Sequence, residues 1–353
     1  MSPRVAIWTS SFEARMEAVA SEVALLRKHL PRSSAWGLHS SAWCRLGTRS
    51  LCLHPKLQLP FRVLTRLLEP LHDVNHVLGS LGDWHYLEGP RRRPVILTAA
   101  VDGMPIDRQL LDRVRVFVAE TPAGRDSLIA DGFDDRVRMI LPPVNLDRFQ
   151  PTAQPDGPFT VLFASSPDRS DWLAGRGVPL LLDTAAELPD VRFRLLWRPW
   201  GDTLPTVDQW VRERSLQNVE IVPGCVADMA TEYAQSHAVI TPFTNAAQCK
   251  PAPNSLIEGL ACGRPAVCTA TVGLAEIVTE TGCGIVAEPN EPALAEGIRR
   301  VRSDWSAFST RARSTAEQLF DERRFVDDYL RLYESVMAPG FLPVSSHAVS
   351  GAA

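Results

Sequence analysis

Residues 159–197 read FTVLFASSPDRSDWLAGRGVPLLLDTAAELPDVRFRLLW. The apolar run over 159–164 predicts a buried strand, the spacing over 179–187 predicts a helix, and 191–197 predicts a second strand. A strand, a helix and a strand in this order form a crossover unit whose two strands lie parallel. The stretch therefore predicts an α/β domain with helices on both faces of a parallel sheet.

The same alternation continues on both sides of this stretch. Toward the amino terminus, strands are expected at 5–8, 74–78, 94–100, 113–119 and 137–141, and helices at 13–29, 61–71 and 123–130. Toward the carboxyl terminus, strands are expected at 219–222, 238–241, 266–269 and 284–287, and helices at 207–214, 229–235, 255–262, near 275 and at 292–302. Residues 32–60 show no clear period, and a last amphipathic helix is expected at 322–337.

The length of the chain indicates two domains. A chain of 353 residues exceeds what one hydrophobic core usually serves, and proline and polar residues are dense over 142–158, as in a linker. We therefore expect two Rossmann-like doubly wound domains that face each other across a cleft. Their expected bounds are 1–150 and 151–320, followed by a helix at 321–337 and a disordered tail at 338–353.

Composition excludes several classes of protein. A chain that is 45% hydrophobic and 22% charged is typical of a folded soluble protein, not of a disordered, collagen-like or coiled-coil chain. The net charge of −4 gives no indication of a nucleic-acid partner. Seven cysteines without a Cys-x-x-Cys pair indicate reduced thiols and no zinc site. Apolar runs are too short for a transmembrane segment or a signal peptide, so we expect a cytoplasmic protein.

The densest motif is KPAPNSLIEGLACGRPAV, at residues 250–267. It predicts a loop, a short helix capped by Asn254 or Ser255, and a turn through Gly263 into a strand. Free amides at the start of such a helix favour an anion. Glu258 lies one turn into the helix, where a carboxylate could accept hydrogen bonds from a ribose diol. The alternative is a plain helix, turn and strand with a solvated Glu258.

This motif resembles the donor-site signature of GT-B glycosyltransferases, in particular the retaining group called family 4. In that signature two glutamates are separated by seven residues, and Glu258 matches the second of them, followed by Cys262, Gly263 and Pro265. Other segments resemble the family pattern in the same order, namely 117–121, 140–151, 176–182, 272–278, 282–286 and 325–333. The resemblance covers about residues 110–337 and implies the GT-B fold and transfer of a sugar from a nucleotide-diphosphate donor. It also implies that the helix at 321–337 crosses back to the first domain.

The sequence departs from the family pattern at several positions. Lys250 replaces the first glutamate, and a lysine cannot accept hydrogen bonds from sugar hydroxyls but can face a diphosphate. Arg176 stands where the family has a phosphate-binding lysine, and Arg169 is the nearest candidate for the partner arginine. The loop at 9–13 has no glycine, and Asp102 follows a strand after which the family often has a histidine.

The resemblance, carried over residue by residue, gives a set of candidate site residues. The expected donor-binding residues are Arg169, Arg176, Arg198, Pro223, Asn254, Ser255, Leu256 and Glu258. The expected catalytic residues are Asp102 and Lys250, and the expected acceptor residues are Ser10, Ser11 and His76. A purely structural role is the alternative for three of these residues: His76 in the core, Asp102 in a turn, and Arg169 on the surface. Trp197 or Trp200 could stack on the nucleotide base or simply pack.

The function expected from the resemblance is glycosyl transfer to a small-molecule acceptor bound by the first domain. No metal and no cofactor besides the nucleotide sugar are expected, and retention of anomeric configuration is the family norm. The first domain shows no basic amphipathic helix, which favours a soluble acceptor over a lipid. Arginine-rich composition suggests a bacterium with a GC-rich genome and natural-product or cell-surface glycoside biosynthesis. A homodimer, a nucleotide-sugar epimerase or phosphorylase on the same scaffold, and a degenerate nucleotide-sugar binder remain open.

Overall fold

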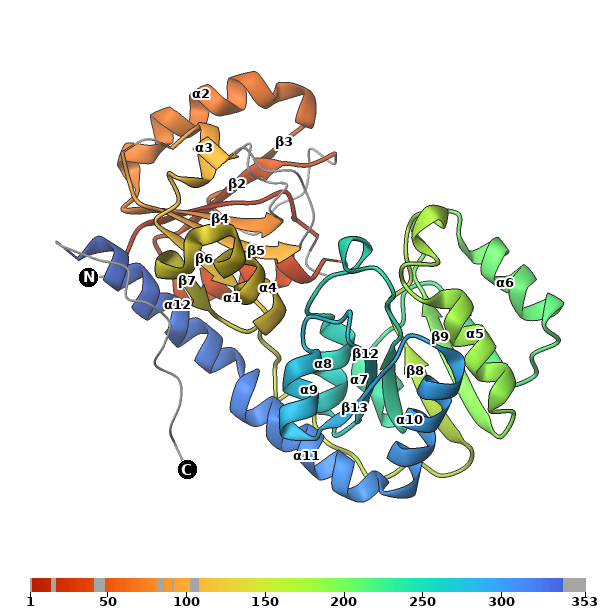
Figure 1. The fold of residues 1–353 in the computed structure, drawn as a ribbon. Coiled ribbons are helices and arrows are strands. Elements are labelled where there is room, and N and C mark those ends of the chain that lie inside the picture. Colours follow the sequence, from red (N-terminus) through yellow and green to blue (C-terminus); the bar gives the residue numbers. More distant parts are fainter. Residues whose placement is uncertain are drawn as a thin grey trace. The chain divides into compact units, whose positions relative to one another are not determined.

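The protein consists of two compact units (Figure 1). The computed structural model describes residues 2–13, 17–40, 48–80, 86–90, 92–101 and 108–338. One unit comprises Met1–Pro143 and Arg323–Ala353, and the other comprises Val144–Glu322. We expected the first unit to end at residue 150, whereas it ends at Pro143. Val144 already belongs to the second unit, where its backbone N–H donates to the carbonyl of Phe320 at 2.7 Å. The expected tail lies almost wholly outside the described residues.

The first unit is built on a seven-stranded parallel sheet in the order β3-β2-β1-β4-β5-β6-β7. Its strands are β1 (Val5–Trp8), β2 (Ser34–Leu38), β3 (Ser50–Leu53), β4 (Val74–Ser80), β5 (Val95–Val101), β6 (Val116–Ala119) and β7 (Val137–Met139). Its helices are α1 (Ala18–His29), α2 (Gln58–Leu68), α3 (Arg108–Leu111), α4 (Pro122–Leu128) and α12 (Glu322–Met337). The helix α12 belongs to the first unit from Arg323 onward, although it follows the second unit in the sequence.

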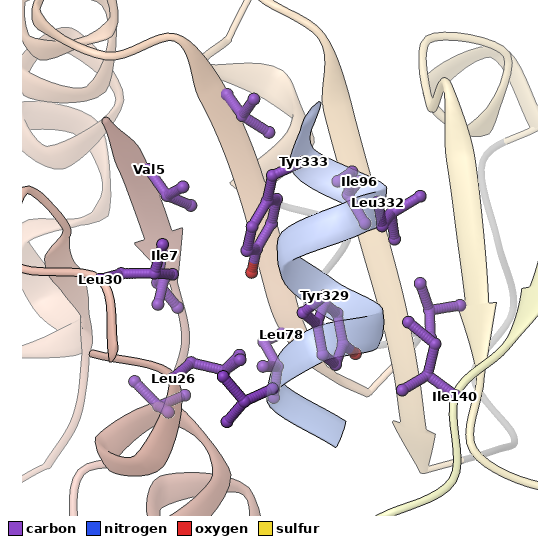
Figure 2. Packing of buried hydrophobic residues seen from close by; sticks show 14 of the residues in the cluster. Val5, Ile7, Leu26, Leu30, Leu78, Ile96, Ile140, Tyr329, Leu332 and Tyr333 are labelled. Carbon is purple, nitrogen blue, oxygen red and sulfur yellow. The ribbon is translucent and has the colours of Figure 1, made fainter. Parts of the chain in front are cut away.

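Both faces of the central strands of this sheet are buried. Val5 and Ile7 of β1 belong to one hydrophobic cluster and Ala6 and Trp8 to another, as the alternation of side chains along a strand requires. Figure 2 shows the cluster that contains Val5 and Ile7, in which Tyr329, Leu332 and Tyr333 of α12 pack against the strands. Burial on both faces explains why these strands read as continuous apolar runs in the sequence.

The second unit is built on a six-stranded parallel sheet in the order β10-β9-β8-β11-β12-β13. Its strands are β8 (Phe159–Phe163), β9 (Val191–Trp197), β10 (Val219–Pro223), β11 (Ala238–Thr241), β12 (Ala266–Thr269) and β13 (Gly284–Ala287). Its helices are α5 (Val178–Glu187), α6 (Leu204–Glu213), α7 (Met229–Ala234), α8 (Asn254–Ala261), α9 (Ala275–Thr281), α10 (Glu291–Ser303) and α11 (Trp305–Leu319). The strand order reverses between β8 and β11, which are neighbours.

The structure contains elements that the sequence did not predict. Two strands, β2 and β3, occupy the region 32–60 that shows no clear period, and the helix α11 was not expected. In the described part of the helix expected at 13–29, helical structure begins at Ala18. Across the described ranges, no helix combines the length and the apolar character needed to span a membrane.

Candidate functional site

The candidate site lies in the second unit, beyond the carboxyl ends of β8 and β11. In an open parallel sheet, ligands bind outside the carboxyl ends of the strands where the strand order reverses. The loop after β8 continues through Ser165 and Ser166 to Arg176 at the start of α5. The loop after β11 leads through Lys250 to α8. Two basic residues, Arg176 and Lys250, and the start of α8 therefore belong to this edge. Arg198, which follows the neighbouring strand β9, is the third basic residue.

Arg176 is held by a tight turn between β8 and α5. Gly177 has a φ of +71°, and a Cβ there would lie 1.8 Å from the carbonyl oxygen of Pro242, so this position requires glycine. The Arg176 Nε donates to the carbonyl of Gln248 at 2.7 Å, and its guanidinium lies 5.5 Å from the ring of Phe243. In the described part of the chain its terminal nitrogens have no hydrogen-bond partner. These nitrogens form a fork suited to two oxygens of a phosphate.

Arg198 follows β9 and lies over the indole of Trp200, with 3.6 Å between the guanidinium carbon and the ring centroid. The Trp200 Nε1 donates to the carbonyl of Ser166, and the Arg198 N–H donates to the Ser166 Oγ, both at 3.1 Å. Burial, and to a smaller extent the charge of Arg176, lowers the pKa of Arg198 to about 10. Two half-buried cations that repel each other are both stabilised by an anion.

Lys250 is bound to the first residue of α8. Its Nζ donates to the Oδ1 of Asn254 at 3.1 Å, and the residue before the helix is Pro253. The expected cap by Asn254 or Ser255 is therefore wrong, since neither side chain caps α8. The Ser255 Oγ instead lies 3.3 Å from the Oγ of Ser165, which joins α8 to the loop after β8.

Glu258 is half-buried one turn into α8. The Tyr233 hydroxyl donates to its Oε2 at 2.9 Å. Burial raises the pKa of Glu258 to about 7, although this hydrogen bond and the charges of Arg148 and Lys250 favour the ionised form. The carboxyl is oriented by a tyrosine instead of being freely solvated, and it can accept further hydrogen bonds when ionised.

Four other predicted positions have different surroundings. Leu256 is fully buried, so it could reach a ligand only through its backbone. Arg169 is exposed and binds Asp171 through two hydrogen bonds of 3.0 and 2.9 Å, which agrees with a surface role. Pro223 is exposed at the end of β10. Trp197 is buried and donates to the Thr203 Oγ1 at 3.1 Å, so it packs in the core and offers no face for stacking.

In the first unit the prediction of His76 as an acceptor residue is wrong. His76 is fully buried in β4, with its Nδ1 2.7 Å from the Tyr333 hydroxyl and its Nε2 2.7 Å from the Thr98 Oγ1. Burial lowers its pKa to about 3, so it is a neutral core residue. Ser10 and Ser11 lie in the loop after β1, where the Ser11 N–H donates to the Thr9 Oγ1 at 3.1 Å. Asp102 lies outside the described residues.

The sequence reading missed three contributors to the site. Ser165 and Ser166 follow an apolar strand directly, a pattern that could have indicated them. Tyr233 is 25 residues from Glu258, and no local motif marks it. Within the described ranges, no group of three or more His, Cys, Asp or Glu side chains is placed to hold a metal ion.

The sequence around this site is similar to sequences of known glycosyltransferases. Residues 160–304 match the family described as Glycosyl transferases group 1. A curated relative, D-inositol 3-phosphate glycosyltransferase 1 of Catenulispora acidiphila, is 26% identical over 250 residues, or 63% of this chain. The match spans 58% of the length of that relative.

Solved structures match nearly the whole chain. Alr3699/HepE of Anabaena, in complex with UDP and glucose, is 16% identical with a TM-score of 0.76 and covers 94% of this chain and 100% of its own. A glycosyltransferase of Rickettsia africae is 16% identical with a TM-score of 0.73, covering 96% and 100%. The expected fold is confirmed: the chain has the two Rossmann-like domains of the GT-B fold. The family match lies entirely within the second unit.

Proposed function

We propose that this protein is a glycosyltransferase that takes a sugar from a nucleotide-diphosphate donor bound by the second unit. The observation that carries the proposal is a group of three cations at the edge where the strand order reverses. Arg176 and Arg198 lie close enough to repel each other, and Lys250 is bonded to the first residue of α8. The match to Glycosyl transferases group 1 covers these residues and supports the proposal. The name of the Catenulispora relative and the UDP and glucose bound to the Anabaena protein support it as well.

Each side chain has a proposed role. The terminal nitrogens of Arg176 and the guanidinium of Arg198 bind the diphosphate, and Lys250 adds a point charge beside it. Glu258 accepts hydrogen bonds from the ribose, oriented by Tyr233. Catalysis consists of positioning the sugar and stabilising the departing diphosphate. We propose a small-molecule acceptor, with Ser10 and Ser11 among the acceptor contacts, no metal requirement and retention of configuration.

A panel of UDP, GDP, ADP, TDP and their common sugar conjugates tests the donor site by thermal shift. A ligand at 100 times its Kd adds about 2.7 kcal/mol to the free energy of unfolding, so one nucleotide should stand out. Glu258→Ala should abolish most of that shift, while Glu213→Ala, on the exposed side of α6, should leave it intact. A panel without any shift contradicts the proposal.

Turnover separates a transferase from a binder. Slow release of free sugar from the stabilising donor, undiminished by excess chelator, is expected of a metal-independent transferase. The alternative of a catalytically degenerate binder is favoured by one observation, the lysine at position 250. Lys250→Glu restores the family pattern: if the donor binds tightly without turnover in both forms, the protein is a binder.

A further inference from the structure

A cavity lies at the amino ends of four strands of the first sheet. Its volume is about 450 Å³, a size typical of small-molecule sites. Its lining includes Arg4, Arg32, Arg49 and His72, each one or two residues before β1, β2, β3 or β4. These strands are neighbours in the order β3-β2-β1-β4, so the residues before them meet at one edge. Substrates of a parallel sheet bind at the opposite edge, beyond the carboxyl ends, so this cavity is separate from the acceptor site proposed above.

The charge of the cavity is positive. Arg4 is compensated by Asp73, with which it forms an ion pair of 2.5 Å. Within the described ranges, no ion pair involves Arg32 or Arg49. Burial lowers the pKa of His72, so its imidazole adds no charge at neutral pH. Two guanidinium charges of the lining therefore have no counter-charge.

A further cation lies close to Arg49. Arg27 is half-buried in the last turn of α1, and burial, with a smaller contribution from the charge of Arg49, lowers its pKa. Its Nε and Nη1 are buried and have no hydrogen-bond partner among the described residues. An anion bound beside Arg49 would relieve this repulsion, because an opposite charge stabilises the ionised form of a cation.

Arg49 is held in a strained backbone conformation. Its φ is +55°, and it is one of two described residues other than glycine with a positive φ. Its carbonyl accepts the Ala35 N–H at 3.1 Å, and its Nη1 donates to the carbonyl of Pro31 at 2.9 Å. A residue with a Cβ pays for this conformation, and such strain is found mostly at functional sites. Glycine at this position would remove both the strain and the charge.

The rest of the lining is aromatic and apolar. The Trp36 Nε1 donates to the Ser34 Oγ at 2.5 Å, and the Ser34 Oγ lies 2.8 Å from the His72 Nε2. The His72 Nδ1 lies 2.9 Å from the carbonyl of Leu68. These polar atoms are engaged with one another, so the half-buried ring of Trp36 and the side chains of Leu68 and Leu71 offer a ligand mainly apolar contact.

We propose that this cavity binds a small soluble phosphomonoester that has an aromatic or apolar body. Arg32 and Arg49 bind the phosphate, whose charge of nearly two at neutral pH matches the two uncompensated guanidinium groups. Trp36 packs against the body of the ligand. The ligand is an effector and not a substrate, because it binds at the amino ends of the strands. The proposal rests on the first unit alone and is independent of the proposed function.

Titration calorimetry with phenyl phosphate at constant ionic strength tests the cavity. The full chain should bind phenyl phosphate at least about tenfold more tightly than phenol or inorganic phosphate. Arg32→Gln and Arg49→Gly should each weaken this binding at least about tenfold, because each removes charge-assisted hydrogen bonds. Arg49→Gly should not lower the melting temperature, since glycine adopts a positive φ without strain. Arg66→Gln, at an exposed arginine of α2 outside the lining, is the matched control and should bind like the unmodified protein.

Arg176→Ala separates this cavity from the phosphate site proposed in the second unit. Binding of phenyl phosphate that persists in Arg176→Ala and is lost in Arg49→Gly supports the proposal. Three results would overturn it: no binding of phenyl phosphate, binding lost in Arg176→Ala but kept in Arg49→Gly, or an affinity for phenol equal to that for phenyl phosphate. Equal affinities for inorganic phosphate and phenyl phosphate would contradict the role of Trp36. A nucleotide panel without any thermal shift contradicts only the proposed function.

Discussion

Glu258 should make donor binding depend on pH in the neutral range. Burial raises the pKa of this carboxyl from 4.5 to about 7, so the unliganded protein is a mixture of protonated and ionised forms near neutrality. Ribose hydroxyls donate hydrogen bonds best to the ionised carboxylate. The ionised fraction is about 90% at pH 8 and about 10% at pH 6. Affinity for the donor should therefore fall about tenfold, or about 1.4 kcal/mol, between these two values.

The same carboxyl should affect stability, with a sign that follows from its raised pKa. The folded protein holds the proton more tightly than the unfolded chain, so the stabilising contribution is complete below pH 4.5. It is lost as the pH rises through about 7, and the whole difference is about 3 kcal/mol. Glu258→Gln should remove this dependence and be the more stable form at pH 8.

Isothermal titration with the stabilising nucleotide sugar measures the first effect, because a nucleotide-sugar diphosphate has no proton that titrates between pH 6 and 8. Neighbouring groups with shifted pKa values titrate elsewhere: burial raises that of Cys262 to about 12, and hydrogen bonding to Arg148 lowers that of Asp228. Glu258→Gln should bind weakly and without pH dependence. A tenfold loss that persists in Glu258→Gln would refute the assignment of this titration to Glu258.

Three further predictions concern the site and the two cores. Arg176→Ala should weaken binding of the bare nucleoside diphosphate about 10- to 100-fold in titration calorimetry, because it removes charge-assisted hydrogen bonds. Gly177→Ala should lower the free energy of unfolding by about 1–3 kcal/mol more than Gly157→Ala does, as measured in urea. Both glycines have a positive φ, but only the first leaves no space for a Cβ. Tyr333→Phe should cost about 1–3 kcal/mol in the same assay, since it leaves a ring nitrogen of buried His76 without its hydrogen bond.

Sequence reasoning located most strands of the second sheet because each is a short apolar run with turn residues on both sides. The observed bounds of β9, β11, β12 and β13 are those expected. The helix α11 was missed because its buried positions are few within a run of serine, threonine and arginine. The strand β2 was missed because Ser34 and Gly37 leave no continuous apolar run in its five residues. Local composition therefore predicts an element only where burial is continuous.

The residues of the candidate site were likewise predicted where they share a local motif and missed where they do not. Lys250, Asn254, Ser255 and Glu258 lie in one motif, so a resemblance could indicate them together. Their partners come from elsewhere: the hydroxyl that orients Glu258 is 25 residues away, and the serine that contacts Ser255 is 90 residues away. His76 failed for a similar reason, since Tyr333, 257 residues distant, makes it a core residue. Contacts of this range follow from the fold and not from any motif.

The helix α2 shows what periodicity leaves undetermined even where the helix itself is predicted. Its sequence places apolar residues on two sides, one with Phe61 and the other with Leu59, Val63 and Leu67. The spacing of residues predicts which of them share a side of the helix, but it does not predict which side packs against the sheet. Because the sheet takes the side of Phe61, the other three remain in solvent beside Arg66.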